Sequence, residues 1–353
     1  MTTIYSKSHG SLLDMGWSPF FQQQLTLEEW DSTIAVRVVA QHRSYFDCLS
    51  EQGYFRLNFT PNMPTLTVGD WLLVDRDLKF IRCLERLSLF SRRSAGSEVS
   101  EQYIAANIDT VFIVSSLNQD FNLNRIERYL VIAKEAGVEP VIVLTKADLC
   151  EDVDSHVEQI RELDSMLVVE TINALEHDDI FRLHAWCRKG TTITLLGSSG
   201  VGKSTIVNGL LNETTMATGD IRESDAKGRH TTTARVMSFM SSGGVLIDTP
   251  GMRELQLADC ERGINDTFAD IEQLAQQCKF SNCQHTNEPQ CQVQSAIERG
   301  DLTERRLHSY RKLKREQAIN GATLAERRAR DKSLSKMYRT VQSSARQMKQ
   351  DGN

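Results

Sequence analysis

A glycine-rich segment between an apolar run and a helical stretch constrains the fold more than any other feature of this sequence. The apolar run covers residues 191–196, and the helical stretch begins near Ser204. Glycines let successive backbone N–H groups turn inward onto phosphate oxygens at a helix N-terminus. The order of strand, loop and helix therefore predicts a phosphate-binding loop (P-loop) made of Gly197, Ser198, Ser199, Gly200, Val201, Gly202, Lys203, Ser204 and Thr205.

Two P-loop residues and a later aspartate are candidates for phosphoryl-transfer chemistry. We expect Lys203 to reach the β and γ phosphates of a nucleotide and Ser204 to hold Mg²⁺. Downstream, an apolar run ends in Asp248-Thr-Pro-Gly251. The Asp248 carboxylate is expected to support the Mg²⁺ shell, and the Gly251 N–H to sense the γ-phosphate. The polar residues 227–233 occupy the place of a switch loop that supplies a threonine to Mg²⁺, and the candidates are Thr231, Thr232 and Thr233.

A short motif upstream of the P-loop predicts which base is bound. The motif consists of Thr145, Lys146, Ala147 and Asp148, and it follows a strand-like run at 140–144. Asp148 can accept hydrogen bonds from N1–H and the exocyclic amine of guanine, a pair of donors that adenine lacks, while Lys146 lies along the base. Thr145 replaces the commoner asparagine. An ATP-using P-loop enzyme, such as a kinase, is the alternative if the motif is accidental.

The position of this motif predicts an unusual chain order. No guanine-specificity motif follows Gly251, so the order is specificity loop, P-loop, switches. Such a circular permutation is tolerated where the original termini lie close together on the surface. The loop that normally supports guanine as Ser-Ala has its best match in Asn173-Ala174. The sequence therefore predicts a circularly permuted GTPase domain, built as a doubly wound α/β sheet with a helix at 123–136 that Gly137 ends.

The remaining segments predict a multidomain α/β protein. Short β-branched runs separated by turn residues favour a small barrel of OB type, and its exposed side chains would suit RNA contacts or simply form ordinary strand faces. The RNA candidates are Arg37, Arg43, Arg56, Arg92, Arg93, Tyr45, Tyr54 and Phe55. We expect an N-terminal extension at 1–33, an OB-type barrel at 34–98, the permuted GTPase domain at 104–260, a helical zinc-binding domain at 261–318 and a basic tail at 319–353.

Four potential metal ligands lie close together near the C-terminal end of the sequence. They are Cys278, Cys283, His285 and Cys291. Three thiolates and an imidazole complete the tetrahedral shell of one structural Zn²⁺, which leaves no open position for metal catalysis. The role of the ion would be to stabilise the fold of a small domain. Free buried cysteines beside a surface histidine are the alternative.

Charge and hydropathy limit the partners of the protein. The net charge is -6, yet residues 303–353 contain fourteen Lys or Arg against five Asp or Glu. The basic residues Arg305, Arg306, Arg311, Lys312, Lys314 and Arg315 indicate either a solvated helix or RNA contact. Apolar runs are too short to span a bilayer, and the first ten residues lack the apolar core of a secretory signal. We expect a cytoplasmic monomer with no membrane partner.

Together these motifs resemble the ribosome small subunit-dependent GTPase A family. The segments 228–233, 248–252 and 278–285 are similar to family signatures, and the resemblance covers nearly the whole chain. It implies that the protein binds the small ribosomal subunit and its rRNA in the GTP state, late in maturation, hydrolyses GTP in response and is released. Without the resemblance, the residues indicate only a GTPase with additional domains that suit RNA binding. A second hypothesis is therefore an RNA-binding module that is controlled by its nucleotide and acts away from the ribosome.

One substitution bears on the rate of hydrolysis. Many GTPases place a water-orienting glutamine directly after the Asp-x-x-Gly glycine, where this chain has Met252. A thioether is a weak hydrogen-bond acceptor and cannot orient water. We therefore expect slow intrinsic hydrolysis, completed by a group supplied or ordered on the subunit or by His230, which could equally be a solvent-facing loop residue. The chain after the second switch leads into the zinc domain, so nucleotide state could move that domain.

Overall fold

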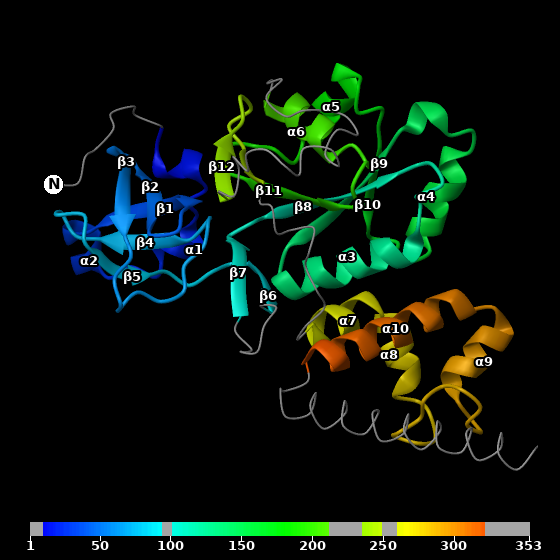
Figure 1. The fold of residues 1–353 in the computed structure, drawn as a ribbon. Helices are drawn as coiled ribbons and strands as arrows, with labels where there is room; N and C mark the ends of the chain where they lie inside the picture. The colour runs from blue at the N-terminus through cyan, green and yellow to red at the C-terminus, as the bar shows by residue number, and fades with distance from the viewer. Residues whose placement is uncertain (1–9, 94–100, 212–234, 249–259, 322–353) are drawn as a thin grey trace, which may run out of the picture.

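The computed structural model describes residues 10–93, 101–211, 235–248 and 260–321 (Figure 1). Most of the strands form one eleven-stranded sheet, whose main path runs β10-β9-β8-β11-β13-β12-β1-β2-β3, with β4 paired to β1 and β5 paired to β4. Helical sequence follows at the C-terminal end. Within the described residues, no helix is long and apolar enough to cross a membrane.

In the N-terminal part, an antiparallel sheet packs against short helices through one core, and its strands enclose a second core. Its elements are η1 (Leu12–Met15), α1 (Pro19–Gln22), α2 (Leu27–Ser32), β1 (Ile34–Gln41), β2 (Tyr45–Ser50), β3 (Gly53–Asn58), β4 (Trp71–Val74) and β5 (Phe80–Cys83). The strand order β3-β2-β1-β4-β5 fits a five-stranded, partly open barrel, and the OB assignment stays a prediction. A separate hairpin, β6 (Leu89–Arg93) with β7 (Glu101–Ala106), links this part to the next.

The central part is a mostly parallel sheet covered by helices on both faces, as the sequence predicts. Its elements are β8 (Thr110–Ser116), α3 (Leu123–Ala136), β9 (Glu139–Thr145), η2 (Ala147–Leu149), α4 (Val153–Arg161), β10 (Val168–Thr171), α5 (His177–Leu183), β11 (Thr192–Gly197), α6 (Lys203–Leu211), β12 (Arg235–Phe239) and β13 (Val245–Asp248). Along β8, Phe112 and Val114 pack in the core that includes α5 and α6, whereas Ile113 packs in the core that includes α3 and α4. This alternation explains why β8 is apolar throughout.

The helix α3 shows how local signals set element ends. Asn122 precedes its first turn and accepts a hydrogen bond from the Arg125 N–H, which satisfies a donor that the helix leaves unpaired. Gly137 ends the helix with φ +75°, in the left-handed region where glycine is unstrained. The predicted bounds, 123–136 with Gly137 as the stop, are confirmed.

The C-terminal part is helical and packs beneath α3. It consists of α7 (Glu261–Thr267), α8 (Ala269–Ala275), α9 (Gln292–Arg299) and α10 (Glu304–Gly321). Figure 1 shows α7 and α10 against the face of α3 that points away from the sheet. We refer to residues 260–321 as the C-terminal unit.

A buried arginine joins three parts of the chain. The Arg37 side chain on β1 is 1% exposed and donates to the backbone carbonyls of Met15, Gly69 and Asn107. It also donates to Thr192 Oγ1 on β11 at 2.9 Å. The expectation that Arg37 and Phe55 contact RNA is wrong, because both side chains are buried.

Replacing Arg37 tests this junction. We expect Arg37→Met to lower the free energy of unfolding by roughly 2–5 kcal/mol, because the Met15 and Asn107 carbonyls would be left buried without this donor. Denaturant unfolding of the purified protein measures the effect. Arg43→Met, on an exposed turn, is the matched control and should change the free energy of unfolding little. If the two variants were equally stable, Arg37 would not join these parts of the chain.

Candidate nucleotide-binding site and metal centre

The predicted P-loop lies between β11 and α6, at the carboxyl edge of the parallel strands. Gly197, Gly200 and Gly202 all have positive φ, at +153°, +79° and +96°. A Cβ at Gly197 would lie 2.4 Å from the Val114 carbonyl oxygen, so no side chain fits there. The loop therefore has the backbone freedom and the position at a helix N-terminus that phosphate binding requires.

Two cations from different elements lie on this loop. Lys203 Nζ donates to the Gly197 carbonyl at 2.9 Å and to the Ser198 carbonyl. Arg125 Nη1, from the first turn of α3, donates to Ser198 Oγ at 2.7 Å. The sequence motif includes Lys203 and Ser198 but gives no signal for Arg125, which lies 73 residues from Ser198.

The structure brings the specificity motif and the P-loop together. Strand β9 ends at Thr145 and pairs with β8, which pairs in turn with β11. Thr145 is 1% exposed, and its Oγ1 donates to the Val201 carbonyl of the P-loop at 2.7 Å. A threonine can therefore link the two loops at the position where asparagine is commoner. Lys146 has φ +58°, and the Asp148 side chain is exposed.

The loop after β10 contacts the specificity motif. The Ile172 carbonyl accepts a hydrogen bond from the Ala147 N–H, which joins this loop to the specificity motif. Asn173 turns its side chain onto its own loop, where Oδ1 accepts from the Leu175 N–H at 3.1 Å. Its backbone N–H donates to Asp179 Oδ2 at 2.6 Å. The Asn173-Ala174 pair thus lies next to the predicted base site, and its contact to guanine stays a prediction.

The remaining predicted residues of the nucleotide site are only partly described. Asp248 is the last residue of β13, which runs parallel to β11. Asp248 therefore lies at the same sheet edge as the P-loop, and a Mg²⁺ site shared with Ser204 stays a prediction. Gly251, Met252, His230 and the threonines 231–233 lie outside the described residues.

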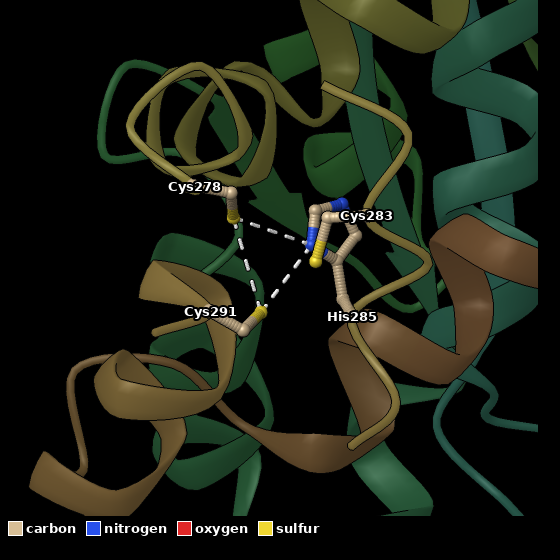
Figure 2. Close-up of side chains that lie close together, drawn as sticks. All are labelled: Cys278, Cys283, His285 and Cys291. Carbon is tan, nitrogen blue, oxygen red and sulfur yellow. Dashed lines mark hydrogen bonds between the residues drawn. The ribbon is translucent and has the colours of Figure 1, made fainter. Parts of the chain in front are cut away.

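The four predicted metal ligands point toward one another (Figure 2). Their ligand atoms all lie within 4.8 Å of one another. His285 Nδ1 is 3.7 Å from Cys278 Sγ and 3.5 Å from Cys291 Sγ, and the two sulfurs are 3.9 Å apart. Bonds of about 2.3 Å to sulfur and 2.0–2.1 Å to nitrogen in a tetrahedron place ligand atoms about 3.5–3.8 Å apart. The cluster fits Zn²⁺, whereas a disulfide needs sulfurs about 2.05 Å apart.

Protonation in this cluster depends on its surroundings. Burial, together with the charge of Arg311, lowers the pKa of His285, which favours the neutral imidazole that binds metal. Desolvation and the neighbouring Cys291 and Cys278 thiols raise the pKa of Cys283 to about 11. A bound divalent cation would reverse this effect, because coordination deprotonates a thiol.

The basic residues of α10 divide into two groups. Arg305 and Arg306 form ion pairs with Glu127 of α3, and Arg306 is only 5% exposed. Arg311, Lys314 and Arg315 line a depression of about 1060 Å³ beside the metal cluster. The first group attaches α10 to the central domain. In the second group, Lys314 pairs with Glu272 and Arg311 donates to the Gln284 and His285 carbonyls, so RNA contact stays a prediction.

Replacing Thr145 tests whether its hydrogen bond prepares the nucleotide site. We expect Thr145→Val to weaken binding of a non-hydrolysable GTP analogue about 5- to 30-fold, because the P-loop loses a buried hydrogen bond to the specificity motif. Thr194→Val is the matched control, since Thr194 makes a similar buried bond to the Ile247 carbonyl on the same sheet. Fluorescence titration gives the affinity of each variant for the analogue. An equal loss of affinity in the two variants would mean that the Thr145 hydrogen bond contributes only to the stability of the fold.

Comparisons with known proteins agree with this geometry. The family model described as RsgA GTPase matches residues 83–258. "Small ribosomal subunit biogenesis GTPase RsgA 2" of Vibrio parahaemolyticus is 56% identical over 99% of this chain and 97% of its own length. "Small ribosomal subunit biogenesis GTPase RsgA" of Mesorhizobium japonicum is 46% identical over 89% of this chain and 92% of its own.

Solved structures share the fold. YjeQ from Thermotoga maritima superposes with a TM-score of 0.59 and 25% identity, covering 80% of this chain and 97% of that one. YloQ, described as a circularly permuted GTPase, gives a TM-score of 0.57 at 21% identity, with 82% and 97% covered. The predicted permutation of the fold is thus confirmed, and the chain belongs to the RsgA GTPase family, whose members are enzymes that hydrolyse GTP.

Proposed function

We propose that this GTPase acts in maturation of the small ribosomal subunit: it binds the subunit in the GTP state, hydrolyses GTP when the subunit stimulates it, and is released. The ribosomal partner is supported by the relative that is 56% identical over 99% of the chain and is named for biogenesis of this subunit. The nucleotide is supported by the bond from Thr145 Oγ1 to the Val201 carbonyl, which joins a guanine-type motif to a P-loop.

The proposed roles of the site residues follow from their positions. Lys203 neutralises charge on the β and γ phosphates, and the Gly251 N–H senses the γ-phosphate. Ser204 and Asp248, at one sheet edge, would hold Mg²⁺, which would stabilise the negative charge that develops on the phosphates. His230 is the candidate for orienting the attacking water.

Asp148 and Lys146 select the base. The exposed Asp148 carboxylate accepts the two donors of guanine, and Lys146 packs along the ring plane. The left-handed backbone of Lys146 ends the strand β9 and begins the short turn that holds Asp148. This arrangement disfavours the alternative ATP-using enzyme, since adenine would leave the carboxylate without these donors.

Two surfaces are suited to rRNA. Near the metal cluster, Lys279, Arg311, Lys314 and Arg315 surround a depression that also exposes Phe280. On the N-terminal sheet, the Arg56 guanidinium lies 3.8 Å from the Tyr45 ring centroid, and the His42 ring stacks on Tyr45 at 4.3 Å. Cations beside aromatic rings can stack unpaired bases and neutralise phosphates.

One Zn²⁺ at Cys278, Cys283, His285 and Cys291 has a structural role in this proposal. We expect Cys283→Ala to abolish zinc binding and to lower the melting temperature, because metal-ligand bonds stabilise a small helical unit. Metal analysis of purified protein measures zinc per chain. Cys150→Ala, a half-buried cysteine outside the cluster, should keep one equivalent, and a zinc-free unmodified protein would refute the assignment.

GTP hydrolysis with and without purified small ribosomal subunits tests the main proposal. We expect a slow basal rate, because Met252 cannot orient water, and a many-fold increase with small subunits but not with large ones. Lys203→Ala should abolish hydrolysis, and excess ATP should not compete. Lack of stimulation would favour an RNA-binding module acting away from the ribosome, and equal competition by ATP would exclude guanine specificity.

A further inference from the structure

Helix α3 contacts the P-loop at its first turn. Arg125 Nη1 donates to Ser198 Oγ at 2.7 Å, and the Arg125 side chain is half-buried. Within the described ranges, no carboxylate lies within ion-pair distance of Arg125, although many other arginines of the protein have such a partner. The guanidinium therefore adds positive charge next to the loop, and no carboxylate of the described residues pairs with it.

The same helix holds the C-terminal unit through buried charges. Glu127, which is 0% exposed, accepts hydrogen bonds from Arg305 and Arg306 at 2.9–3.1 Å. One residue farther on, Arg128 pairs with Glu316 at 2.6 Å. Removing one partner of the buried Glu127 carboxylate is costly, so its ion pairs make α3 and α10 move together.

The far end of α3 is attached to the start of the C-terminal unit. Arg262 Nη2 donates to the carbonyls of Lys134 and Glu135 at the helix terminus. The Gly263 N–H donates to Glu135 Oε2 at 2.7 Å, and a Cβ at Gly263 would lie 2.2 Å from the Val131 carbonyl oxygen. The start of α7 thus packs with its backbone directly against α3.

We propose that Arg125 is a positioning residue that couples occupation of the P-loop by GTP to the position of the C-terminal unit. A guanidinium forms strong, charge-assisted hydrogen bonds to phosphate. A triphosphate and a diphosphate place different charge at the loop, so they attract Arg125 differently. Because α3 contacts the C-terminal unit along its length, a shift at its first turn is passed on to α10. This inference rests on the proposed binding of GTP.

The coupling is measurable by hydrogen exchange of the full-length protein. Samples saturated with GDP or with a non-hydrolysable GTP analogue, both with Mg²⁺, are compared over α7 and α10. We expect amide exchange there to differ about fivefold or more between the two nucleotides, the lower end of typical coupling between sites. Arg125→Met and Ser198→Ala should each reduce this difference to within about twofold.

The controls separate this inference from the proposed function. Arg299→Met replaces an arginine of α9 that pairs only locally with Asp301, and it should leave the difference unchanged. Nucleotide binding is titrated in each sample. An unmodified protein that does not bind the analogue refutes GTP binding itself. The role of Arg125 is refuted, and GTP binding is not, in two cases. In the first, the analogue binds but does not alter amide exchange in α10. In the second, the difference in exchange between the two nucleotides persists in Arg125→Met or Ser198→Ala.

Discussion

The buried guanidinium of Arg37 joins the N-terminal part of this protein to the central sheet. Burial lowers its pKa to about 10, while the charges of Asp109 and Asp70 oppose that shift. The group therefore stays charged at neutral pH inside the protein, which is tolerated because backbone carbonyls and Thr192 accept its hydrogen bonds. Since Thr192 belongs to the strand that leads into the P-loop, the N-terminal sheet and the nucleotide site share one rigid junction.

Strand pairing strengthens this junction, whereas the C-terminal unit is attached differently. Strand β1 pairs with β12, so backbone hydrogen bonds continue from the N-terminal sheet into the central one. The described part of the C-terminal unit has no strand and is joined to α3 by side-chain ion pairs and helix packing. A packed helix such as α3, with the C-terminal unit attached to it, can shift against the sheet more readily than a continuous ladder breaks. The C-terminal unit is therefore the appendage best suited to respond to nucleotide.

Local patterns predicted the nucleotide motifs, the limits of α3 and the metal cluster because each depends on neighbours in sequence. A glycine-rich loop, a glycine that ends a helix or closely spaced ligands can be recognised in a short window. The burial of Arg37 could not be predicted this way, since an alternating strand suggests an exposed arginine. Residues 12–21 cover that face of β1, with Phe21 packed near Trp71. The contacts of Arg125 and Arg305 were missed for the same reason, because their partners lie far away in the chain.

The permuted chain order gives the nucleotide site two connections to the C-terminal unit. The first is covalent, because residues 249–259 join β13, which ends at Asp248, directly to α7. The second is the packed helix α3, which contacts the P-loop through Arg125. Both connections meet where Arg262 and Gly263, at the start of α7, bind the end of α3. Because α7 is fixed there, it cannot move without moving α3 or breaking the contacts at Glu135. The response to GTP is therefore expected to be a concerted movement of α3 and the C-terminal unit against the sheet.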